Sequence, residues 1–346
     1  MVKVAFFDSK IYDEETFNKI NENYNFKLSF FKDKLSHETV SLTKNFDIVC
    51  VFVNDNIDSD VISKLLENNV KLIALRCAGY NNVDLKNAYK NINVVRVPAY
   101  SPYAVAEHAV ALMLTLNRKI HKAYNRTREN NFTLNGLMGF DMHNKTIGVI
   151  GTGKIGKTLI NILRGFNMNI LAYDVFPDKD FEKESGVKYV DLMDIYKRSD
   201  IISLNCPLTK DTFHLINYDS ISLMKKNVMI INTSRGKLID TSALIDALKE
   251  QKIGSAGLDV YEEESEYFFE DFSSSFIEDD LLARLLSFNN VIITSHQGFF
   301  TFEALTNIAE TTLQNIKDFI DNKPLVNEIC YRCDSICVHK TKGRCF

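Results

Sequence analysis

The sequence predicts an α/β protein with two doubly wound parallel-sheet domains. Three observations support this fold class. Short apolar runs alternate with amphipathic stretches over the first hundred residues and again between residues 147 and 294. One of the apolar runs leads directly into a glycine-rich turn, Gly151-Thr-Gly153-Lys-Ile-Gly156. The chain has 346 residues, which exceeds one average domain and fits two.

The first hundred residues predict a small parallel α/β unit of the flavodoxin-like kind. Strands are expected at Lys3–Phe7, Asp47–Val53, Lys71–Arg76 and Asn93–Val97, and helices at Ser59–Asn69 and Leu85–Lys90. Two loops follow the predicted strands closely, at residues 76–80 and 98–100. Such loops carry function in parallel sheets, and Gly79 permits a ligand to approach the backbone.

A long helix is predicted to open the second domain, because Ser101 suits the N-cap and Pro102 the first helical position. Strand patterns follow at Ile147–Ile150, Ile170–Tyr173, Ile201–Leu204, Val228–Asn232, Ala256–Asp259 and Val291–Thr294. Six strands with intervening helices make a complete doubly wound sheet. We expect the last amphipathic helix, roughly 301–322, to return to the first domain. The predicted domains are therefore 1–100 with 300–330, and 101–299, followed by a mobile cysteine-rich tail at 331–346.

The glycine-rich turn is a dinucleotide-binding fingerprint. Gly151 allows the tight turn from strand to helix, Gly153 lets the backbone approach a pyrophosphate, and Gly156 lets the helix pack on the strand. The N-terminus of the following helix favours the phosphates through its free N–H groups and dipole. Asp174 ends the next strand, where it would bind both ribose hydroxyls and repel a 2′-phosphate. The pattern predicts NAD rather than NADP.

The bulk composition excludes several classes of protein. A formal net charge of -4 gives no electrostatic footprint for nucleic acid. The longest apolar runs are far shorter than a membrane span, and the N-terminus lacks the pattern of a signal peptide. We therefore expect a cytoplasmic protein with neither nucleic acid nor membrane as partner. Cys50, Cys77 and Cys206 lie in or beside apolar strand patterns and are expected to be reduced, buried thiols.

Three candidate catalytic residues each follow a different strand of the second domain: Arg235, Glu264 and His296. An imidazolium is the natural proton donor near neutral pH, and a carboxylate beside it would favour its charged form and fix its orientation. A guanidinium can hold a substrate carboxylate with two hydrogen bonds. Two alternatives stay open, because Arg235 would also suit the pyrophosphate and Glu264 ends a run of acids typical of a solvated loop. His108 and His121, on the long helix, are interpreted as satisfied structural residues.

Together these segments resemble the D-isomer-specific 2-hydroxyacid dehydrogenase family, and within it the fermentative NAD-dependent D-lactate branch. The resemblance spans about residues 1–329. It is carried by RCAGYNNVDL (76–85), VRVPAYSPYAVAEHAVALMLTLNRKIHKAYNRTREN (95–130), GVIGTGKIGKT (148–158), NTSRGKLID (232–240), GLDVYEEE (257–264) and SHQGFFT (295–301). The family's catalytic arginine, glutamate and histidine fall on Arg235, Glu264 and His296.

The resemblance implies further site residues and an activity. Besides the three glycines, the cofactor would be lined by Lys154, Ile155, Asp174, Cys206, Pro207, Thr212, Thr233, Ser234 and Asp259. The substrate would be bound by Ala78, Gly79, Tyr100, Arg235, His296 and Phe299. The implied reaction is the reversible reduction of pyruvate to D-lactate by NADH, with His296 as proton donor, in a homo-oligomer, either a dimer or a tetramer. The alternatives are a larger 2-oxo acid such as 2-oxoisocaproate and, from another class, an NAD(H)-sensing corepressor.

Two stretches are not explained by this reading. The stretch from Tyr261 to Asp280 contains nine acids and no base, interleaved with aromatic residues. We interpret this insert as a structured surface or subunit contact rather than a second site. The tail carries Cys330, Cys333, Cys337, His339 and Cys345. This spacing invites a zinc interpretation, but the tail lacks the second hairpin of a structural zinc site, so we expect a mobile, oxidisable tail and no metal.

Overall fold

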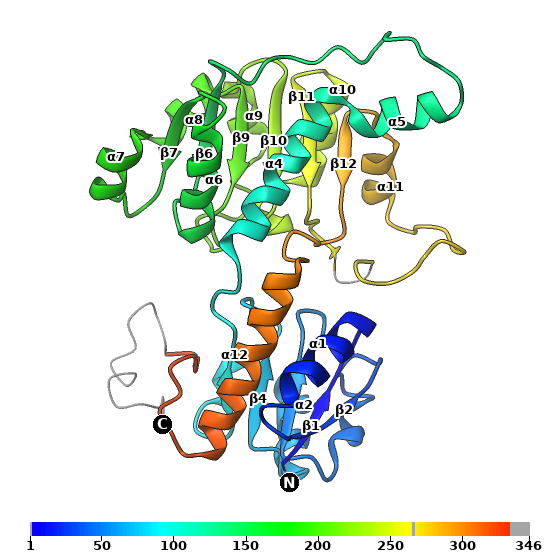
Figure 1. Cartoon of the computed structure of the whole chain (residues 1–346), viewed down its shortest axis with the longest axis vertical. Coiled ribbons are helices and arrows are strands. Elements are labelled where there is room, and N and C mark those ends of the chain that lie inside the picture. Colours follow the sequence, from blue (N-terminus) through cyan, green and yellow to red (C-terminus); the bar gives the residue numbers. More distant parts are fainter. Residues whose placement is uncertain (1, 265–266, 333–346) are drawn as a thin grey trace. The chain divides into compact units, whose positions relative to one another are not determined.

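The computed structural model describes residues 2–264 and 267–332. Contacts between residues divide the chain into two compact units (Figure 1). Unit 1 takes in the residues up to Ser101 and those from Phe300 onward, and unit 2 is Pro102–Phe299.

Unit 1 is a five-stranded parallel sheet with the strand order β2-β1-β3-β4-β5. This is the doubly wound order of flavodoxin-like folds, in which the order reverses beside β1. Its strands are β1 (Lys3–Phe6), β2 (Lys27–Phe30), β3 (Ile48–Val51), β4 (Leu72–Leu75) and β5 (Asn93–Val95). Its helices are α1 (Ile11–Asn21), the 3₁₀ turn η1 (Val40–Thr43), α2 (Ser59–Glu67), α3 (Leu85–Ala88) and α12 (Phe302–Ile320).

The edge strand β2 was missing from the prediction. Its sequence, KLSF, is short, and none of its four residues is fully buried. It pairs with β1 on one side only. A half-exposed edge strand needs neither an unbroken apolar run nor strict alternation, so the pattern gave no signal there.

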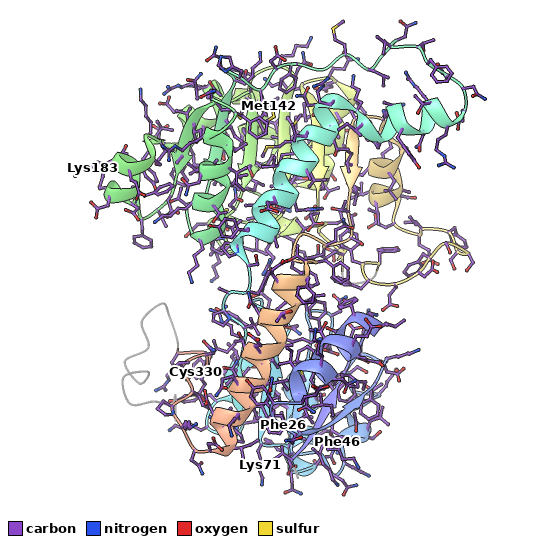
Figure 2. The ribbon with its side chains drawn as sticks, in the orientation of Figure 1. Phe26, Phe46, Lys71, Met142, Lys183 and Cys330 are labelled. Atoms are coloured by element: carbon purple, nitrogen blue, oxygen red, sulfur yellow. The ribbon has the colours of Figure 1, made fainter. Side chains whose placement is uncertain are left out.

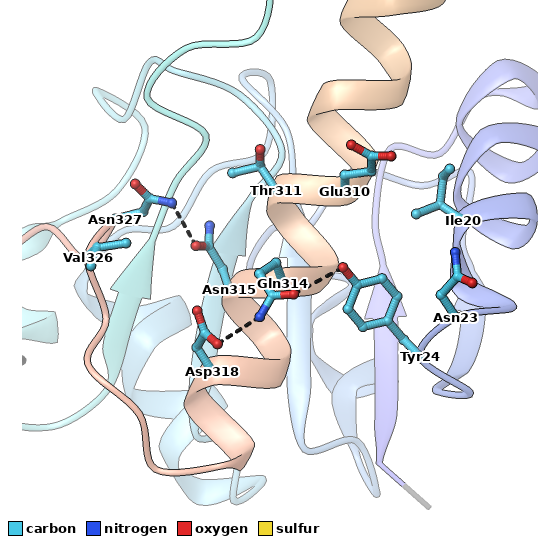
Figure 3. A pocket seen from close by; sticks show the side chains of 10 residues that line it. All are labelled: Ile20, Asn23, Tyr24, Glu310, Thr311, Gln314, Asn315, Asp318, Val326 and Asn327. Atoms are coloured by element: carbon cyan, nitrogen blue, oxygen red, sulfur yellow. Dashed lines mark hydrogen bonds between the residues drawn. The ribbon is translucent and has the colours of Figure 1, made fainter.

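The helix α12 belongs to unit 1 although it lies near the far end of the chain. It packs against β4 and α1. Tyr24, just after α1, donates its hydroxyl proton to Oε1 of Gln314 at 3.2 Å, and Nε2 of Gln314 donates to Asp318 at 2.8 Å (Figure 3). These bonds line a shallow surface pocket between the two helices. Cys330 is buried in the same unit (Figure 2).

A buried arginine lies at the carboxyl end of β4. Arg76 is 1% exposed, donates through Nη2 to the carbonyl oxygen of Asp8 at 2.7 Å, and stacks on Phe52. Asp13 lies 3.4 Å from the same nitrogen. Arg76 opens the loop that the sequence singled out for function, but these contacts give its side chain a structural role in unit 1.

Unit 2 is a seven-stranded parallel sheet in the order β12-β11-β10-β9-β6-β7-β8, and it confirms the predicted Rossmann class. Its strands are β6 (Thr146–Ile150), β7 (Asn169–Tyr173), β8 (Lys188–Tyr189), β9 (Ile201–Leu204), β10 (Val228–Asn232), β11 (Ile253–Leu258) and β12 (Val291–Ile293). The two-residue strand β8 was not predicted. The helices are α4 (Pro102–Arg118), α5 (Ile120–Arg128), α6 (Lys154–Arg164), α7 (Lys179–Ser185), α8 (Leu192–Arg198), α9 (Tyr218–Leu223), α10 (Thr241–Lys249) and α11 (Asp280–Ser287), with a 3₁₀ turn η2 (Gly236–Leu238).

Alternate residues of the central strands build two separate cores, one on each face of this sheet. Ile202 and Ile230 face one core, whereas Ile201, Met229 and Ile231 face the other. The second core is closed by α4 and α6, which pack side by side (Figure 1), and by the buried side chain of Met142 (Figure 2). Because both faces are covered, the strands read as continuous apolar runs. Within the described ranges, none of the helices has the length and apolar character needed to cross a membrane.

Asp55 provides a test of what holds the loops of unit 1. Its buried carboxylate accepts from the backbone N–H of Leu35 through one oxygen and of Phe52 through the other, both at 2.5 Å. Asp55→Asn turns an amide N–H₂ toward one of these donors, so it should lower the free energy of unfolding by about 1–3 kcal/mol in urea denaturation. The control is Asp58→Asn, because a single oxygen of Asp58 accepts both backbone bonds at the start of α2. This change should cost less than about 0.5 kcal/mol, and equal losses in the two variants would contradict the argument.

Candidate active site

The loops that carry the predicted catalytic and cofactor residues of unit 2 leave the same edge of its sheet. The strands are parallel, so their carboxyl ends lie together. The glycine-rich turn follows β6, Asp174 follows β7, Cys206 follows β9, and Arg235 and Glu264 follow β10 and β11. His296 follows β12, which lies next to β11. The topology therefore gives these residues one common edge, as expected from their order in the sequence.

The glycine-rich turn has the geometry that a dinucleotide requires. Gly151 adopts φ +94°, which side chains rarely allow, and a Cβ there would lie 2.6 Å from the backbone of Asn205. A Cβ on Gly156 would lie 2.0 Å from the carbonyl oxygen of Gly151, whereas one on Gly153 would meet nothing within 4 Å. Gly153 caps α6 without a side-chain bond. The first N–H groups of the helix, at Lys154 and Ile155, have no partner within the helix, and the space beside Gly153 is open, so a phosphate could approach them.

Asp174 is already engaged with the turn. Its Oδ2 accepts from the backbone N–H of Thr152 at 2.7 Å and from the Thr152 hydroxyl at 3.0 Å, and its Oδ1 accepts from the N–H of Phe176. A carboxylate offers about four acceptor positions, so these bonds leave capacity for a ribose hydroxyl. The negative charge of Asp174 also stays beside the turn, so it would disfavour a cofactor that carries a 2′-phosphate next to it.

The loops after β9 and β10 are tied to each other. The Ser234 hydroxyl, after β10, donates to the carbonyl oxygen of Cys206, after β9, at 2.6 Å. Within the loop after β9, the Thr212 hydroxyl donates to the carbonyl oxygen of Pro207 at 2.7 Å. Burial raises the pKa of Cys206 to about 11, so its thiol is neutral and unreactive. In the described chain the buried hydroxyl of Thr233 has no hydrogen-bond partner. An orphaned hydroxyl among the predicted cofactor residues fits a site built for a polar ligand.

His296 and Glu264 form a direct pair. Nδ1 of His296 lies 2.9 Å from Oε1 of Glu264, and the other carboxylate oxygen accepts from the backbone N–H of Tyr261 at 2.9 Å. A carboxylate can only accept, so Nδ1 must carry a proton and Nε2 is left to exchange one. Both side chains are about one-fifth exposed. The pair therefore has the access and the tautomer that an acid–base catalyst needs.

Asp259, which ends β11, fixes the loop that carries His296. Its Oδ1 accepts from the Thr294 hydroxyl at 2.5 Å and from the N–H of Gln297 at 2.9 Å, and its Oδ2 accepts from the N–H of Gly298 at 2.8 Å. Its carbonyl oxygen accepts from the N–H of His296. Burial would raise the pKa of Asp259, but hydrogen bonds from His108 and Thr294 outweigh it and hold that pKa below its usual range. The role in cofactor binding that the sequence assigned to Asp259 stays a prediction.

Arg235 lies on a loop that packs against the loop of Glu264. A Cβ on Gly236 would lie 2.0 Å from the backbone of Tyr261, so the two segments touch directly. Nη1 of Arg235 donates to the carbonyl oxygen of Ser234 at 2.7 Å. A guanidinium has five N–H donors, so this bond leaves most of the fork for a ligand. The geometry is compatible with both roles considered for Arg235, the substrate and the pyrophosphate.

The other predicted substrate residues are divided between the units. Ala78, Gly79 and Tyr100 belong to unit 1. The carbonyl oxygen of Ala78 accepts from Arg96 at 2.7 Å, and that of Tyr100 accepts from Asn307 on α12 at 2.7 Å. These bonds fix the backbone of both loops. Phe299 is a buried residue at the end of unit 2.

Two residues near the catalytic pair were not predicted to act there. The His108 ring hydrogen-bonds to Thr294 and lies beside Asp259. The sequence did contain a signal for His108, because it is a polar residue on the apolar face of the long helix. It lies three residues after Val105 and four residues before Leu112. Phe269, from the acidic and aromatic insert, has its ring centroid 6.0 Å from that of His296. No periodicity marks such a loop contact, so the sequence offered no signal for it.

The tail residues after Arg332 lie outside the described part of the chain, and so does most of the cysteine set considered for zinc. Within residues 2–264 and 267–332, no three His, Cys, Asp or Glu side chains come together as a metal site would require. Cys50, Cys77, Cys206 and Cys330 are buried and reduced, as predicted for the first three.

A phosphate-binding turn in a Rossmann sheet, with an imidazole–carboxylate pair at the same edge, defines the class of dinucleotide-dependent oxidoreductases. Comparison with known proteins gives the family. Residues 110–298 match the model of the D-isomer specific 2-hydroxyacid dehydrogenase, NAD binding domain. The chain belongs to this family, and NAD is its cofactor.

Relatives extend the match beyond that domain. A 2-hydroxyacid dehydrogenase homolog of Haemophilus influenzae is 55% identical over 316 residues, which cover 91% of this chain and 95% of the relative. The D-lactate dehydrogenase of Escherichia coli is 51% identical over 329 residues, covering 95% and 100%. The apo structure of D-lactate dehydrogenase from Escherichia coli superposes with a TM-score of 0.87 at 49% identity, covering 95% of this chain and 100% of that one. The similarity therefore includes both units.

Cofactor choice tests the role of Asp174. Asp174→Asn removes the charge but keeps one oxygen that can accept from Thr152, so the ratio of kcat/KM for NADPH to that for NADH should rise by roughly tenfold. The control is Asp178→Asn, whose carboxylate pairs with Lys157 instead of the turn. An unchanged ratio in Asp174→Asn, or an equal rise in the control, would remove Asp174 from cofactor selection.

Proposed function

We propose that this chain is an NAD-dependent D-lactate dehydrogenase that interconverts pyruvate and D-lactate. The observation that carries the proposal is the hydrogen-bonded pair of His296 and Glu264. The pair lies at the sheet edge that also carries the dinucleotide turn. Reduction of a ketone by hydride needs a proton donor for the oxygen, and the Nε2 atom of His296 is available for that proton.

Each residue of the pair has one task. NADH, which the turn of Gly151, Gly153 and Gly156 would hold, would provide the hydride for C2 of the 2-oxo acid. His296 gives its Nε2 proton to the ketone oxygen in reduction and takes it back in oxidation of the hydroxy acid. Glu264 accepts from Nδ1, which keeps the ring oriented and stabilises the imidazolium form by its negative charge.

We assign Arg235 to the substrate. Its guanidinium can bind the carboxylate of a 2-oxo acid with two parallel hydrogen bonds, and the positive charge also polarises the neighbouring ketone. Support comes from the packing of its loop on the loop of Glu264. Ala78, Gly79, Tyr100 and Phe299 remain substrate-binding assignments that rest on the family resemblance.

Two observations favour pyruvate over larger 2-oxo acids as the proposed substrate. The match to a named D-lactate dehydrogenase is 51% identity over nearly the whole chain. A bulky residue, Phe299, follows His296 closely, and its buried ring would restrict the room for a side chain. A substrate such as 2-oxoisocaproate is the alternative. A corepressor role is less well supported, since it gives no reason for an ordered His296–Glu264 pair.

We further propose that the enzyme is a cytoplasmic homo-oligomer. Large apolar side chains are exposed along α5 and the loop that follows it, where a second copy could cover them. They are Ile120, Tyr124, Phe132, Leu134 and Met138. Light scattering that finds only monomers at micromolar concentration would contradict this part of the proposal.

The function is tested by assaying NADH oxidation with a panel of 2-oxo acids and by determining the configuration of the product. Pyruvate should give the highest kcat/KM, and the lactate formed should be oxidised by a D-specific but not an L-specific lactate oxidase. Higher efficiency with 2-oxoisocaproate or phenylpyruvate would replace the substrate. No turnover of any 2-oxo acid, with NADH still bound, would favour the sensing role.

The pair should be visible in the kinetics of reduction. Glu264 accepts from Nδ1 of His296 through one oxygen and from the N–H of Tyr261 through the other, and glutamine keeps only one oxygen for these two donors. Glu264→Gln should therefore lower kcat/KM for pyruvate by roughly tenfold or more, while the Kd for NADH changes less than about twofold. The control is Glu263→Gln, an exposed neighbour that pairs with Lys237. A wild-type kcat/KM in Glu264→Gln, or an equal loss in the control, would show that Glu264 does not support the proton donor.

Arg235→Lys separates the two roles considered for this residue. Lysine keeps the charge but loses the planar fork, so the KM for pyruvate should rise by roughly tenfold or more while the Kd for NADH changes less than about twofold. Lys237→Arg, two residues along the same loop, is the control for a general disturbance of that loop. If the loss instead appears chiefly in NADH binding, Arg235 serves the pyrophosphate.

A further inference from the structure

His108 occupies an unusual position for a polar side chain. It lies in the second turn of α4, a helix that packs against β10, β11 and β12. Its neighbours on the same helix, Val105, Ala109 and Leu112, are buried in the apolar interior. The His108 side chain is 16% exposed. An ordinary apolar residue would suit this face, so the imidazole needs a specific reason.

The ring points at the residues that hold the His296 loop. Nε2 of His108 lies 3.0 Å from the hydroxyl oxygen of Thr294 and 3.2 Å from Oδ1 of Asp259. The Thr294 hydroxyl lies 2.5 Å from the same Oδ1. A carboxylate only accepts, so the single hydroxyl proton goes to Asp259. The oxygen of Thr294 is then an acceptor, and Nε2 of His108 must carry a proton.

The site is built tightly around this arrangement. A Cβ on Gly298 would lie 2.8 Å from Oδ2 of Asp259 and 3.5 Å from Cδ2 of His108, so only glycine fits there without displacing the group. The N–H of Gly298 donates to that same oxygen. With Thr294, Gln297 and His108 on Oδ1 and Gly298 on Oδ2, four donors lie around the buried carboxylate.

The backbone of this loop depends on those bonds. His296 has φ +54°, a left-handed conformation that is uncommon for a residue with a side chain. Such a conformation persists only where the surrounding contacts determine it. The contacts here are the N–H of His296 on the Asp259 carbonyl oxygen and the bonds of its neighbours on the carboxylate. The left-handed turn sets the direction of the His296 side chain toward Glu264.

We propose that His108 is a positioning residue for the reaction, acting through Thr294 and Asp259 to hold the loop that aims the His296 ring. The proposal rests on the proposed role of His296 as proton donor. The partners of the His108 ring are Thr294 and Asp259, so it acts on His296 at one remove. His108 adds a donor to the carboxylate of Asp259 and so satisfies the remaining acceptor capacity of this buried charge. That carboxylate in turn holds the loop of His296.

Two variants distinguish positioning from simple packing. His108→Leu keeps the volume and removes the donor, so kcat for pyruvate reduction should fall by roughly tenfold to a hundredfold while the Kd for NADH stays within about twofold. His108→Gln restores an N–H near the position of Nε2 and should recover most of the lost kcat. His143→Leu, at an exposed position, controls for loss of a histidine and should behave like the wild type.

The outcomes separate this inference from the proposed function. A wild-type enzyme without activity on any 2-oxo acid would overturn the proposed function. An active wild type with an equally active, folded His108→Leu would overturn the role of His108. Loss of kcat in both His108→Leu and His108→Gln would also contradict it, since the N–H would then not be what matters.

A second measurement decides the matter if His108→Leu does not fold. In the wild type labelled with ¹⁵N-histidine, long-range ¹H–¹⁵N correlation reports which ring nitrogen carries the proton, and His108→Gln identifies the His108 signals by their disappearance. A proton on Nε2 is the expected result. A His108 ring with its only proton on Nδ1 would rule out the donation to Thr294 and with it the proposal.

Discussion

The buried carboxylate of Asp259 is the interaction on which the catalytic edge of unit 2 depends. A charge that is 1% exposed is costly unless donors surround it, and here they come from α4 and from the loop after β12. Since Asp259 itself ends β11, one side chain joins a strand, a helix and the His296 loop. The direction of the imidazole, its pairing with Glu264 and the need for glycine at position 298 all follow from this arrangement.

The sequence predicted the architecture of both sheets because their strands are buried on both faces. Runs such as Ile201–Leu204 and Val228–Asn232 were located to the residue. The missed strands, Lys27–Phe30 and Lys188–Tyr189, lie at the edges of their sheets. An edge strand buries fewer of its side chains and can be very short, so its sequence need not show an apolar pattern. Their place follows from pairing with a neighbour, which a single sequence does not display.

The candidate site divides in the same way. Residues fixed by local backbone geometry could be read directly: Gly151 needs its positive φ, and Gly156 leaves no room for a Cβ. The pairing of His296 with Glu264 was expected from two strand ends and the family resemblance. The partnership of His108 with Asp259 was not, because the two residues are far apart in the sequence and meet only when α4 packs on the sheet. A histidine on an apolar helical face indicates that a partner exists but not which one.

The most direct test of this account is amide hydrogen exchange at Gln297 and Gly298 in the wild type and in Asp259→Asn. Their N–H groups donate to different oxygens of the carboxylate. An asparagine has one oxygen to offer, so at least one of the two amides should exchange roughly tenfold faster or more, while Ile230 in the adjoining core strand should keep its protection. Equal protection of both loop amides in the two proteins would contradict the claim that Asp259 holds the loop of His296.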